Sequence, residues 1–271
     1  MSIASSYTDT VTVLRTAWWL MRKHWLYIIT LSTLAGCFLA AGLPRSGAAA
    51  SGPAPAGAIV KGTVKFQGAV PKPTHIDMSA DPKCVQARPG GGMTQDIEAD
   101  AKGNLQNVIV YVSQGLPGDS KFDQPQESAE IEQKGCTYQP HVVAVRANQE
   151  LKVVNADNTT HNIHPMPNNN RELNQSQAPG APLSITFARE EIAIPVRCNI
   201  HPWMRSYIAV FKNPYFAVTG KDGSFEIPNL PPGSYTITAW HEKLGTSFQK
   251  ITIGESETKT IEFVFKAAPG S

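Results

Sequence analysis

The 271-residue sequence lacks a marked excess of charge of either sign. Its 24 Lys and Arg residues nearly balance its 22 Asp and Glu residues, which gives a formal net charge of +2. Residues 1–50 carry four of the basic side chains and one acidic side chain, so the rest of the chain is close to neutral. No basic cluster stands out beyond residue 50. This distribution excludes the basic surface with which proteins bind nucleic acid.

Helical periodicity and long repeats are also missing after residue 50. Short apolar or alternating runs are instead separated by turn residues, in a chain that holds 21 Gly and 21 Pro. The expected fold class is therefore all-β, with loops at about 69–105 and at 168–184. The runs expected to be strands are 59–66, 107–112, 136–145, 150–155, 183–187, 192–196, 207–211, 224–227, 234–240, 251–253 and 260–265.

The sequence also lacks the side-chain arrangements typical of hydrolytic enzymes. No Ser/His/Asp set and no paired carboxylates stand out at a suggestive spacing. We therefore do not expect an enzyme.

One long uncharged run lies near the N-terminus. Residues 25–43 are mostly apolar, follow Arg22-Lys23-His24, and precede small residues at 44–50. A basic region, an apolar region and small residues are the parts of a secretory signal. We expect residues 1–50 to export the chain and residues 51–57 to form a linker.

Three fates of this N-terminal segment stay open. It is cleaved near residues 48–50, or it is lipidated at Cys37 in Leu34-Ala35-Gly36-Cys37, or it is retained as a membrane helix, since about 20 residues span a bilayer. All three place the remainder outside the cytoplasm. The expected location is periplasmic or extracytoplasmic, with or without a membrane anchor.

The sequence has only four cysteines. Cys37 lies in the N-terminal segment and Cys198 lies in a motif described below, which leaves Cys84 and Cys136. An oxidising compartment would join these two in a disulfide, worth on the order of a few kcal/mol. The alternative is two free buried thiols.

A thiol, an imidazole and a thioether recur at three-residue spacing in one short segment. Cys198, His201 and Met204 form C-x2-H-x2-M, and His161 upstream supplies a second imidazole. A thiolate, two neutral imidazoles and a weak axial thioether are the ligands of a type 1 copper site. Asn162 follows His161 directly, so we expect it to hydrogen-bond around the site.

Other interpretations of the same residues stay open. Zinc bound by His161, His164, Cys198 and His201 would have a suitable tetrahedral N/S ligand set. Cys198 and His201 are otherwise a buried thiol and a loop histidine without a metal. Met166 is a second, weaker axial candidate.

The pair His161-Asn162 followed by Cys198-x2-His201-x2-Met204 resembles the cupredoxin family, and the short loop is most similar to that of amicyanins. The resemblance implies a Greek-key β-sandwich over residues 58–212 that binds one type 1 copper. It also implies electron exchange through an exposed His201 ring. The apolar docking rim would be Ile200, Pro202 and Trp203, and the partner a periplasmic c-type cytochrome or a membrane oxidoreductase.

Two related copper enzymes do not fit this loop. Multicopper oxidases have histidines on both sides of the copper cysteine, where this chain has Arg197 and Asn199. A binuclear copper site would need a second cysteine in the loop, and there is none.

The C-terminal part resembles a different family. Residues 222–239 contain Asp-Gly-Ser-Phe, Leu-Pro-Pro-Gly and alternating Tyr235, Ile237 and Ala239, as in a carboxypeptidase regulatory-like (transthyretin-like) module. This implies a small β-sandwich at 213–267. Because such modules begin with a strand like Gly62-Thr63-Val64, residues 58–112 alternatively pack with this sheet, which would make the copper domain an insertion.

The expected function is that of an exported type 1 copper protein that carries single electrons between redox partners. Two alternatives stay open. The first is a cell-envelope binding or scaffolding protein with a structural metal site. The second is copper storage or delivery.

Overall fold

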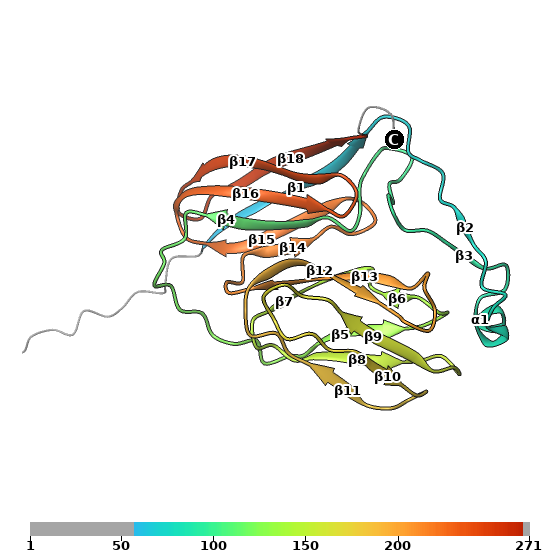
Figure 1. Ribbon diagram of the computed structural model, residues 1–271. Coiled ribbons are helices and arrows are strands. Elements are labelled where there is room, and N and C mark those ends of the chain that lie inside the picture. Colours follow the sequence, from blue (N-terminus) through green and yellow to red (C-terminus); the bar gives the residue numbers. More distant parts are fainter. Residues whose placement is uncertain (1–56, 268–271) are drawn as a thin grey trace, which may run out of the picture. The chain divides into compact units, whose positions relative to one another are not determined.

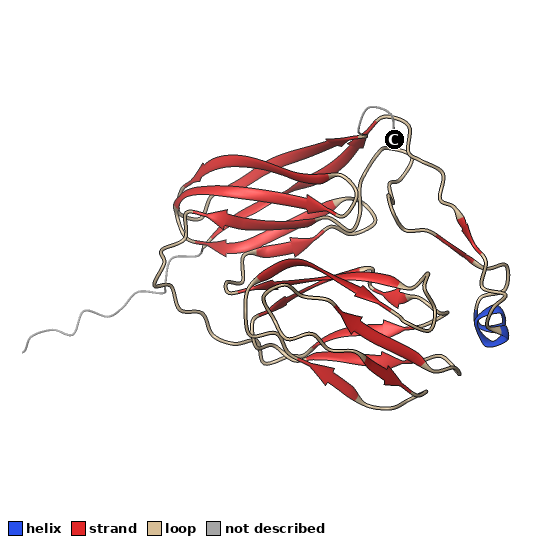
Figure 2. Ribbon diagram, viewed as in Figure 1, coloured by secondary structure: helices blue, strands red, loops and turns tan. Residues whose placement is uncertain are grey.

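The computed structural model describes residues 57–267, which are almost entirely β (Figure 2). The expected all-β fold class is confirmed. One short helix, α1 (Pro82–Ala87), lies in a stretch that the sequence suggested to be loop. The expected N-terminal signal or anchor helix and the lipidation candidate Cys37 lie outside the described residues. Within residues 57–267, no helix has the length and apolar character needed to cross a membrane.

Nine strands form a first sandwich, which contains the candidate site. Its strands alternate buried and exposed side chains, as in β8, because successive residues of a strand point to opposite faces. One sheet has the order β10 (Gln175–Gln177), β9 (His161–Pro165), β12 (Glu191–Arg197), β13 (Arg205–Phe211) and β7 (Val142–Arg146). The other has the order β11 (Leu183–Ile185), β8 (Leu151–Asn155), β5 (Ala129–Gln133) and β6 (Tyr138–Gln139).

Both sheets of this sandwich contribute to one buried core. Leu151 and Val153 come from the four-stranded sheet, and Ile163, Val196 and Ile208 come from the five-stranded sheet. The ladders include two parallel pairs, β7 with β13 and β5 with β8, so the chain crosses between the two sheets instead of forming only hairpins.

A second sandwich combines the first described strands with the last ones. One sheet has the order β15 (Ser224–Leu230), β1 (Ala58–Gln67) and β18 (Thr258–Lys266). The other has the order β14 (Phe216–Val218), β4 (Ile109–Gln114), β16 (Gly233–His241) and β17 (Gly245–Ile253). In Figure 1, β1 (blue) and β4 (green) lie among orange and red C-terminal strands. Two arrangements were expected for residues 58–112. In the structure, β1 and β4 pair with the C-terminal strands.

Close contact between β1 and β18 explains a glycine in the middle of β1. A Cβ added to Gly62 would lie 1.7 Å from the carbonyl oxygen of Ile261 on β18. Only glycine allows the two backbones to approach this closely. The strands between β4 and β14 belong to the first sandwich, which is therefore inserted into the second.

A third apolar cluster joins the two sandwiches. Phe211 on β13 is fully buried and stacks on Phe216 of β14, with ring centroids 4.4 Å apart. Tyr111 of β4 contacts Phe211 at 5.2 Å. Ile109 and Ala209 are buried in the same cluster. The connection between the sandwiches is therefore a packed apolar contact as well as a chain crossover.

An arm between β1 and β4 reaches the first sandwich. It contains β2 (His75–Ile76), α1 and β3 (Gly92–Met93). Met78 and Cys84 of this arm are buried in the core of the first sandwich. A disulfide joins Cys84 to Cys136, between β5 and β6. The end of the arm is therefore attached both by packing and by a covalent bond.

The contact between the sandwiches makes a stability prediction. Phe211→Ala should lower the free energy of unfolding by about 3–5 kcal/mol, because it opens a cavity in a fully buried cluster. Phe248→Ala is the matched control, since that ring is 65% exposed and its loss should change stability by no more than about 0.5 kcal/mol. Chemical denaturation of both variants measures this, and equal effects would contradict the packed contact.

Candidate metal centre

Strand pairing brings the candidate ligands together. β12 ends at Arg197 and β13 begins at Arg205, so residues 198–204 form the loop between two paired strands. β9 begins at His161 and pairs with β12. The first residue of β9 therefore meets the first residues of the loop.

The ligand atoms lie close together and are buried. The Nδ1 atoms of His161 and His201 are 3.0 Å apart, and Cys198 Sγ lies 3.8 Å from His201 Nδ1. The two rings and the thiol provide three ligand atoms that all lie within 4.8 Å of one another. The residues are 0% (His161), 2% (Cys198) and 2% (His201) exposed. The structure thus forms a compact N2S cluster shielded from solvent.

Met204 belongs to the same buried region. It is 1% exposed and lies in the core cluster that contains Cys198. Its backbone N–H donates to the carbonyl of His201 at 2.9 Å, and its own carbonyl accepts from the N–H of Cys198 at 3.3 Å. These two hydrogen bonds close the loop and fix the positions of its two ends. The second axial candidate, Met166, is half-buried and lies outside this cluster.

Two backbone groups point at the thiol. The N–H groups of Asn162 and His201 each donate to Cys198 Sγ at 3.3 Å. Burial raises the pKa of this thiol, but hydrogen bonds from His161, His201 and the backbone outweigh burial and lower the pKa from 9.0 to about 6. The cluster therefore favours a thiolate, the form of cysteine that binds metals.

Asn162 contributes through its backbone and also through its side chain. Its side-chain carbonyl accepts from the N–H of Asn199 at 3.2 Å, and its amide donates to Asn174 at 2.8 Å. The Asn162 carbonyl accepts from the buried Tyr138 hydroxyl. The residue expected to hydrogen-bond around the site thus links β9 to the loop.

Carboxylates hold the outer nitrogens of both rings. His161 Nε2 lies 2.8 Å from Asp157 Oδ2, and His201 Nε2 lies 2.9 Å from Asp81 Oδ2. An ionised carboxylate only accepts hydrogen bonds, so both rings donate from Nε2. Each Nδ1 atom then faces the cluster, where it binds a metal once its proton is lost, and this is how carboxylates orient metal-binding histidines.

Asp157 is itself fixed by two backbone donors. The N–H groups of Gly135 and Cys136 donate to its carboxylate at 2.7 and 2.8 Å. Burial raises the pKa of Asp157, but the hydrogen bond from His161 and these two N–H groups outweigh it and hold the pKa below its ordinary value. Asp157 therefore stays ionised beside His161.

The structure corrects one feature that the cupredoxin resemblance implied. The ring of His201 was expected to be exposed at the surface, but it is buried beneath the arm that carries Asp81. Of the expected apolar rim, Ile200 is 46% exposed and Trp203 is half-buried. The Trp203 ring lies 5.2 Å from the His201 ring, and its Nε1–H donates to the Cys136 carbonyl at 3.1 Å.

His164, which the zinc interpretation required, is held apart from the cluster. Its Nε2 lies 2.6 Å from Glu172 and its Nδ1 lies 3.1 Å from Asn199. His161 and His164 are separated by three positions on one strand, so their side chains point to opposite faces. Of the three histidines in the zinc interpretation, the structure brings only His161 and His201 together with Cys198.

Sequence reasoning missed both aspartates at the histidines. Asp81 lies in the stretch 69–105 that was expected to be loop, and Asp157 precedes the candidate ligand His161 by four residues. Asp81-Pro82 could have indicated a helix start, because Asp favours the N-cap position and Pro the first turn. Nothing local to the stretch around Asp81 links it to His201, which lies 120 residues further along the chain.

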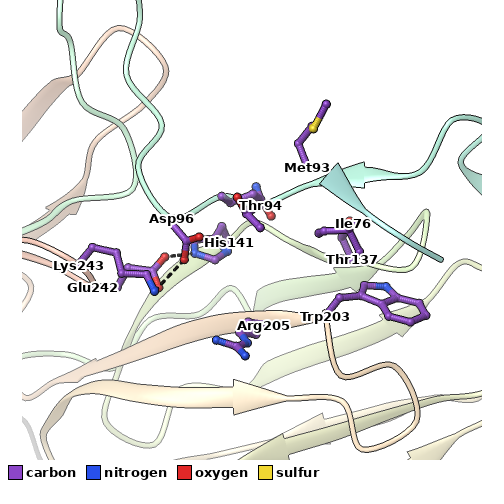
Figure 3. Close-up of a pocket in the computed structure, with 11 residues that line it drawn as sticks. Ile76, Met93, Thr94, Asp96, Thr137, His141, Trp203, Arg205, Glu242 and Lys243 are labelled. Carbon is purple, nitrogen blue, oxygen red and sulfur yellow. Dashed lines mark hydrogen bonds and ion pairs between the residues drawn. The ribbon is translucent and has the colours of Figure 1, made fainter. Parts of the chain in front are cut away.

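Trp203 also lines a small cavity (Figure 3). Its volume is about 250 Å³, and it is lined by side chains from the arm, the loop and the β16–β17 turn. Figure 3 shows the buried pair of His141 and Glu242 and the ion pair of Lys243 and Asp96, which is 2.8 Å long. None of the four candidate ligands lines this cavity.

The donor set fits a copper ion. It combines a thiol with a lowered pKa, two imidazoles with inward Nδ1 atoms and a buried thioether. Thiolate and thioether suit Cu(I), and imidazole suits both oxidation states of copper. His161, Cys198 and His201 would hold the ion, and Met204 is a further candidate ligand in the same buried region.

A family model described as "Polysaccharide lyase family 4, domain II" matches residues 203–261, which is less than half of the chain. It is not a carboxypeptidase regulatory-like model, so the transthyretin-like resemblance stays a prediction. No curated protein matches the chain.

Several solved copper proteins share weak similarity with part of the chain. A Cu-containing nitrite reductase from Thermus scotoductus SA-01 is 19% identical with a TM-score of 0.31, over 37% of this chain and 26% of that chain. A purple cupredoxin from Nitrosopumilus maritimus is 20% identical with a TM-score of 0.27, over 31% and 99%. A Cu(I) form of an amicyanin mutant is 15% identical with a TM-score of 0.29, over 38% and 98%. The chain thus spans about a quarter of the nitrite reductase.

The hydrogen bonds of Asp157 predict that it stabilises the metal-free protein. Asp157→Ala would leave three buried donors without a partner, so the free energy of unfolding should fall by on the order of 3 kcal/mol. Asp222→Ala is the control, because that exposed turn carboxylate also accepts a backbone N–H, and its loss should cost less than about 1 kcal/mol. Equal losses in urea denaturation would show that Asp157 is only a turn residue.

Proposed function

We propose that the protein is an exported type 1 copper protein that carries single electrons between redox partners. One observation carries this proposal: the buried cluster of His161, Cys198 and His201, with the ligand atoms within 4.8 Å of one another. Bound copper would supply a one-electron couple there. The chain supplies the ligands, their orientation and their shielding from water.

Rigidity supports electron transfer over other uses of a metal. Fast electron exchange needs ligands that keep their positions in both oxidation states. Here one ligand begins a strand and the others lie in a loop that is closed by its own backbone hydrogen bonds. The Sγ atom accepts two backbone N–H groups, and each ring is tied to a carboxylate. These contacts hold the cluster in place independently of the ion's charge.

Burial also argues against a catalytic metal. A metal enzyme keeps an open position for substrate or water. The three equatorial candidates are no more than 2% exposed, and Met204 lies beside them in the core. Storage or delivery would need ligands from which the ion leaves readily, which a buried cluster does not offer. Electron transfer is the use that a closed site permits.

We also propose that the protein works outside the cytoplasm, with a periplasmic c-type cytochrome or a membrane oxidoreductase as its partner. The disulfide between Cys84 and Cys136 supports an oxidising compartment, and Cys198 is the remaining free cysteine in the described part of the chain. Ile200, which directly precedes His201, keeps an exposed side chain at the expected docking rim.

Loading the full-length protein with Cu(II) tests the proposal. We expect an intense visible thiolate-to-copper absorption and a reversible one-electron couple. Cys198→Ser should abolish the absorption, because a hydroxyl cannot replace the thiolate. Met204→Leu should keep the absorption and shift the reduction potential, because an axial ligand tunes the potential. A colourless, redox-silent protein that holds zinc would contradict the proposal, and equal loss of colour in both variants would contradict the axial role of Met204.

A further inference from the structure

The arm between β1 and β4 places the carboxylate of Asp81 against His201, a candidate copper ligand from a distant part of the sequence. Asp81 Oδ2 accepts from His201 Nε2 at 2.9 Å and from the Thr159 hydroxyl at 3.0 Å. Asp81 Oδ1 accepts from the N–H of Lys83 at 2.8 Å, as the N-cap of α1. Three donors therefore fix both oxygens of the carboxylate, and one of these donors is the outer nitrogen of a candidate copper ligand.

The arm is fastened at the same place. Cys84 of α1 is joined to Cys136, and both sulfur atoms lie within 4.8 Å of a ring nitrogen of His201. The N–H of Cys136 donates to Asp157, which holds His161, and its carbonyl accepts from Trp203. The disulfide therefore sits among the groups that position both rings, and it keeps Asp81 over His201.

We propose that Asp81 is a positioning residue that holds the His201 ring from outside the sandwich and closes its outer edge to solvent. The redox consequence of this inference rests on the proposed function. Its structural part, the holding and covering of the His201 ring, rests on the geometry alone. By accepting the Nε2–H, Asp81 fixes the tautomer in which Nδ1 is the free ligand atom. A carboxylate on a ligating imidazole makes that imidazole a stronger donor. A stronger donor favours Cu(II) over Cu(I).

Two substitutions separate this role from helix capping. Asp81→Asn keeps the N-cap, because Asn caps a helix about as well as Asp, but it removes the negative charge at His201. Asp81→Ala removes the cap, the charge and the cover of the ring edge. Asp77→Asn is the matched control, because Asp77 lies in the same arm and accepts from the N–H of Ser79 without contacting a ligand.

The first measurement needs no metal. Diethylpyrocarbonate modifies accessible histidine nitrogens, and mass spectrometry of the full-length metal-free protein gives the rate at each histidine. We expect His201 to be protected relative to the exposed His75, and Asp81→Ala to raise its rate at least about tenfold. Asp77→Asn should leave the rate unchanged. If His201 in the unaltered protein reacts as fast as His75, Asp81 does not close the ring edge and the proposal fails.

The second measurement compares affinities for Cu(II) and Cu(I) by competition with chelators. We expect Asp81→Asn to lower the affinity for Cu(II) relative to Cu(I) by about tenfold, since removing such partners costs roughly 10- to 100-fold in metal affinity. For one electron, tenfold corresponds to an upward shift of about 59 mV in the reduction potential. Asp77→Asn should cause no shift.

The outcomes distinguish this inference from the proposed function. If the unaltered protein has a one-electron copper couple but Asp81→Asn leaves the affinity ratio unchanged, the positioning role is refuted and the proposed function stands. If the unaltered protein has no such couple, the proposed function fails. The protection of His201 in the metal-free protein then still decides whether Asp81 positions the ring. If Asp81→Ala does not fold, Asp81→Asn alone decides the redox effect.

Discussion

The structure depends on two imidazole rings being held with their Nδ1 atoms 3.0 Å apart beside a buried thiol. Such an arrangement is unfavourable without support, because it buries three polar groups that compete for the same space. Hydrogen bonds with neighbouring residues supply that support at the two Nε2 atoms and at Sγ. Each Nε2 donates to an aspartate, and Sγ accepts from two backbone N–H groups. The protein's own hydrogen bonds thus hold both rings and the thiol in place.

These supports come from three parts of the chain that are far apart in sequence. β9 and the loop after β12 bring the ligands, the turn between β5 and β6 anchors Asp157, and the arm before β4 brings Asp81. The disulfide ties the last two together. The second sandwich contacts the first through the apolar cluster around Phe211, on the same strand that leaves the metal loop. β13 therefore connects the metal loop, at its first residue, to the contact between the sandwiches, at its last residue.

Local patterns were enough to single out the residues that the structure gathers in the buried cluster and to predict most strands. The C-x2-H-x2-M spacing singled out Cys198, His201 and Met204, and alternation located the C-terminal strands that the structure contains. The strand β5 was missed because its sequence, Ala-Glu-Ile-Glu-Gln, carries one large apolar residue in five. Long-range contacts were beyond reach for a different reason. The parallel pairing of β1 with β18 and the hydrogen bond of Asp81 to His201 join residues more than a hundred positions apart, and no local period encodes them.

X-ray absorption at the copper edge of the full-length protein, in both oxidation states, tests the central claim most directly. The account predicts a first shell of two nitrogen atoms and one short sulfur contact whose distances change little on reduction, because the ligands are fixed by the protein. A shell of only oxygen and nitrogen atoms, or a sulfur contact that is lost on reduction, would contradict it.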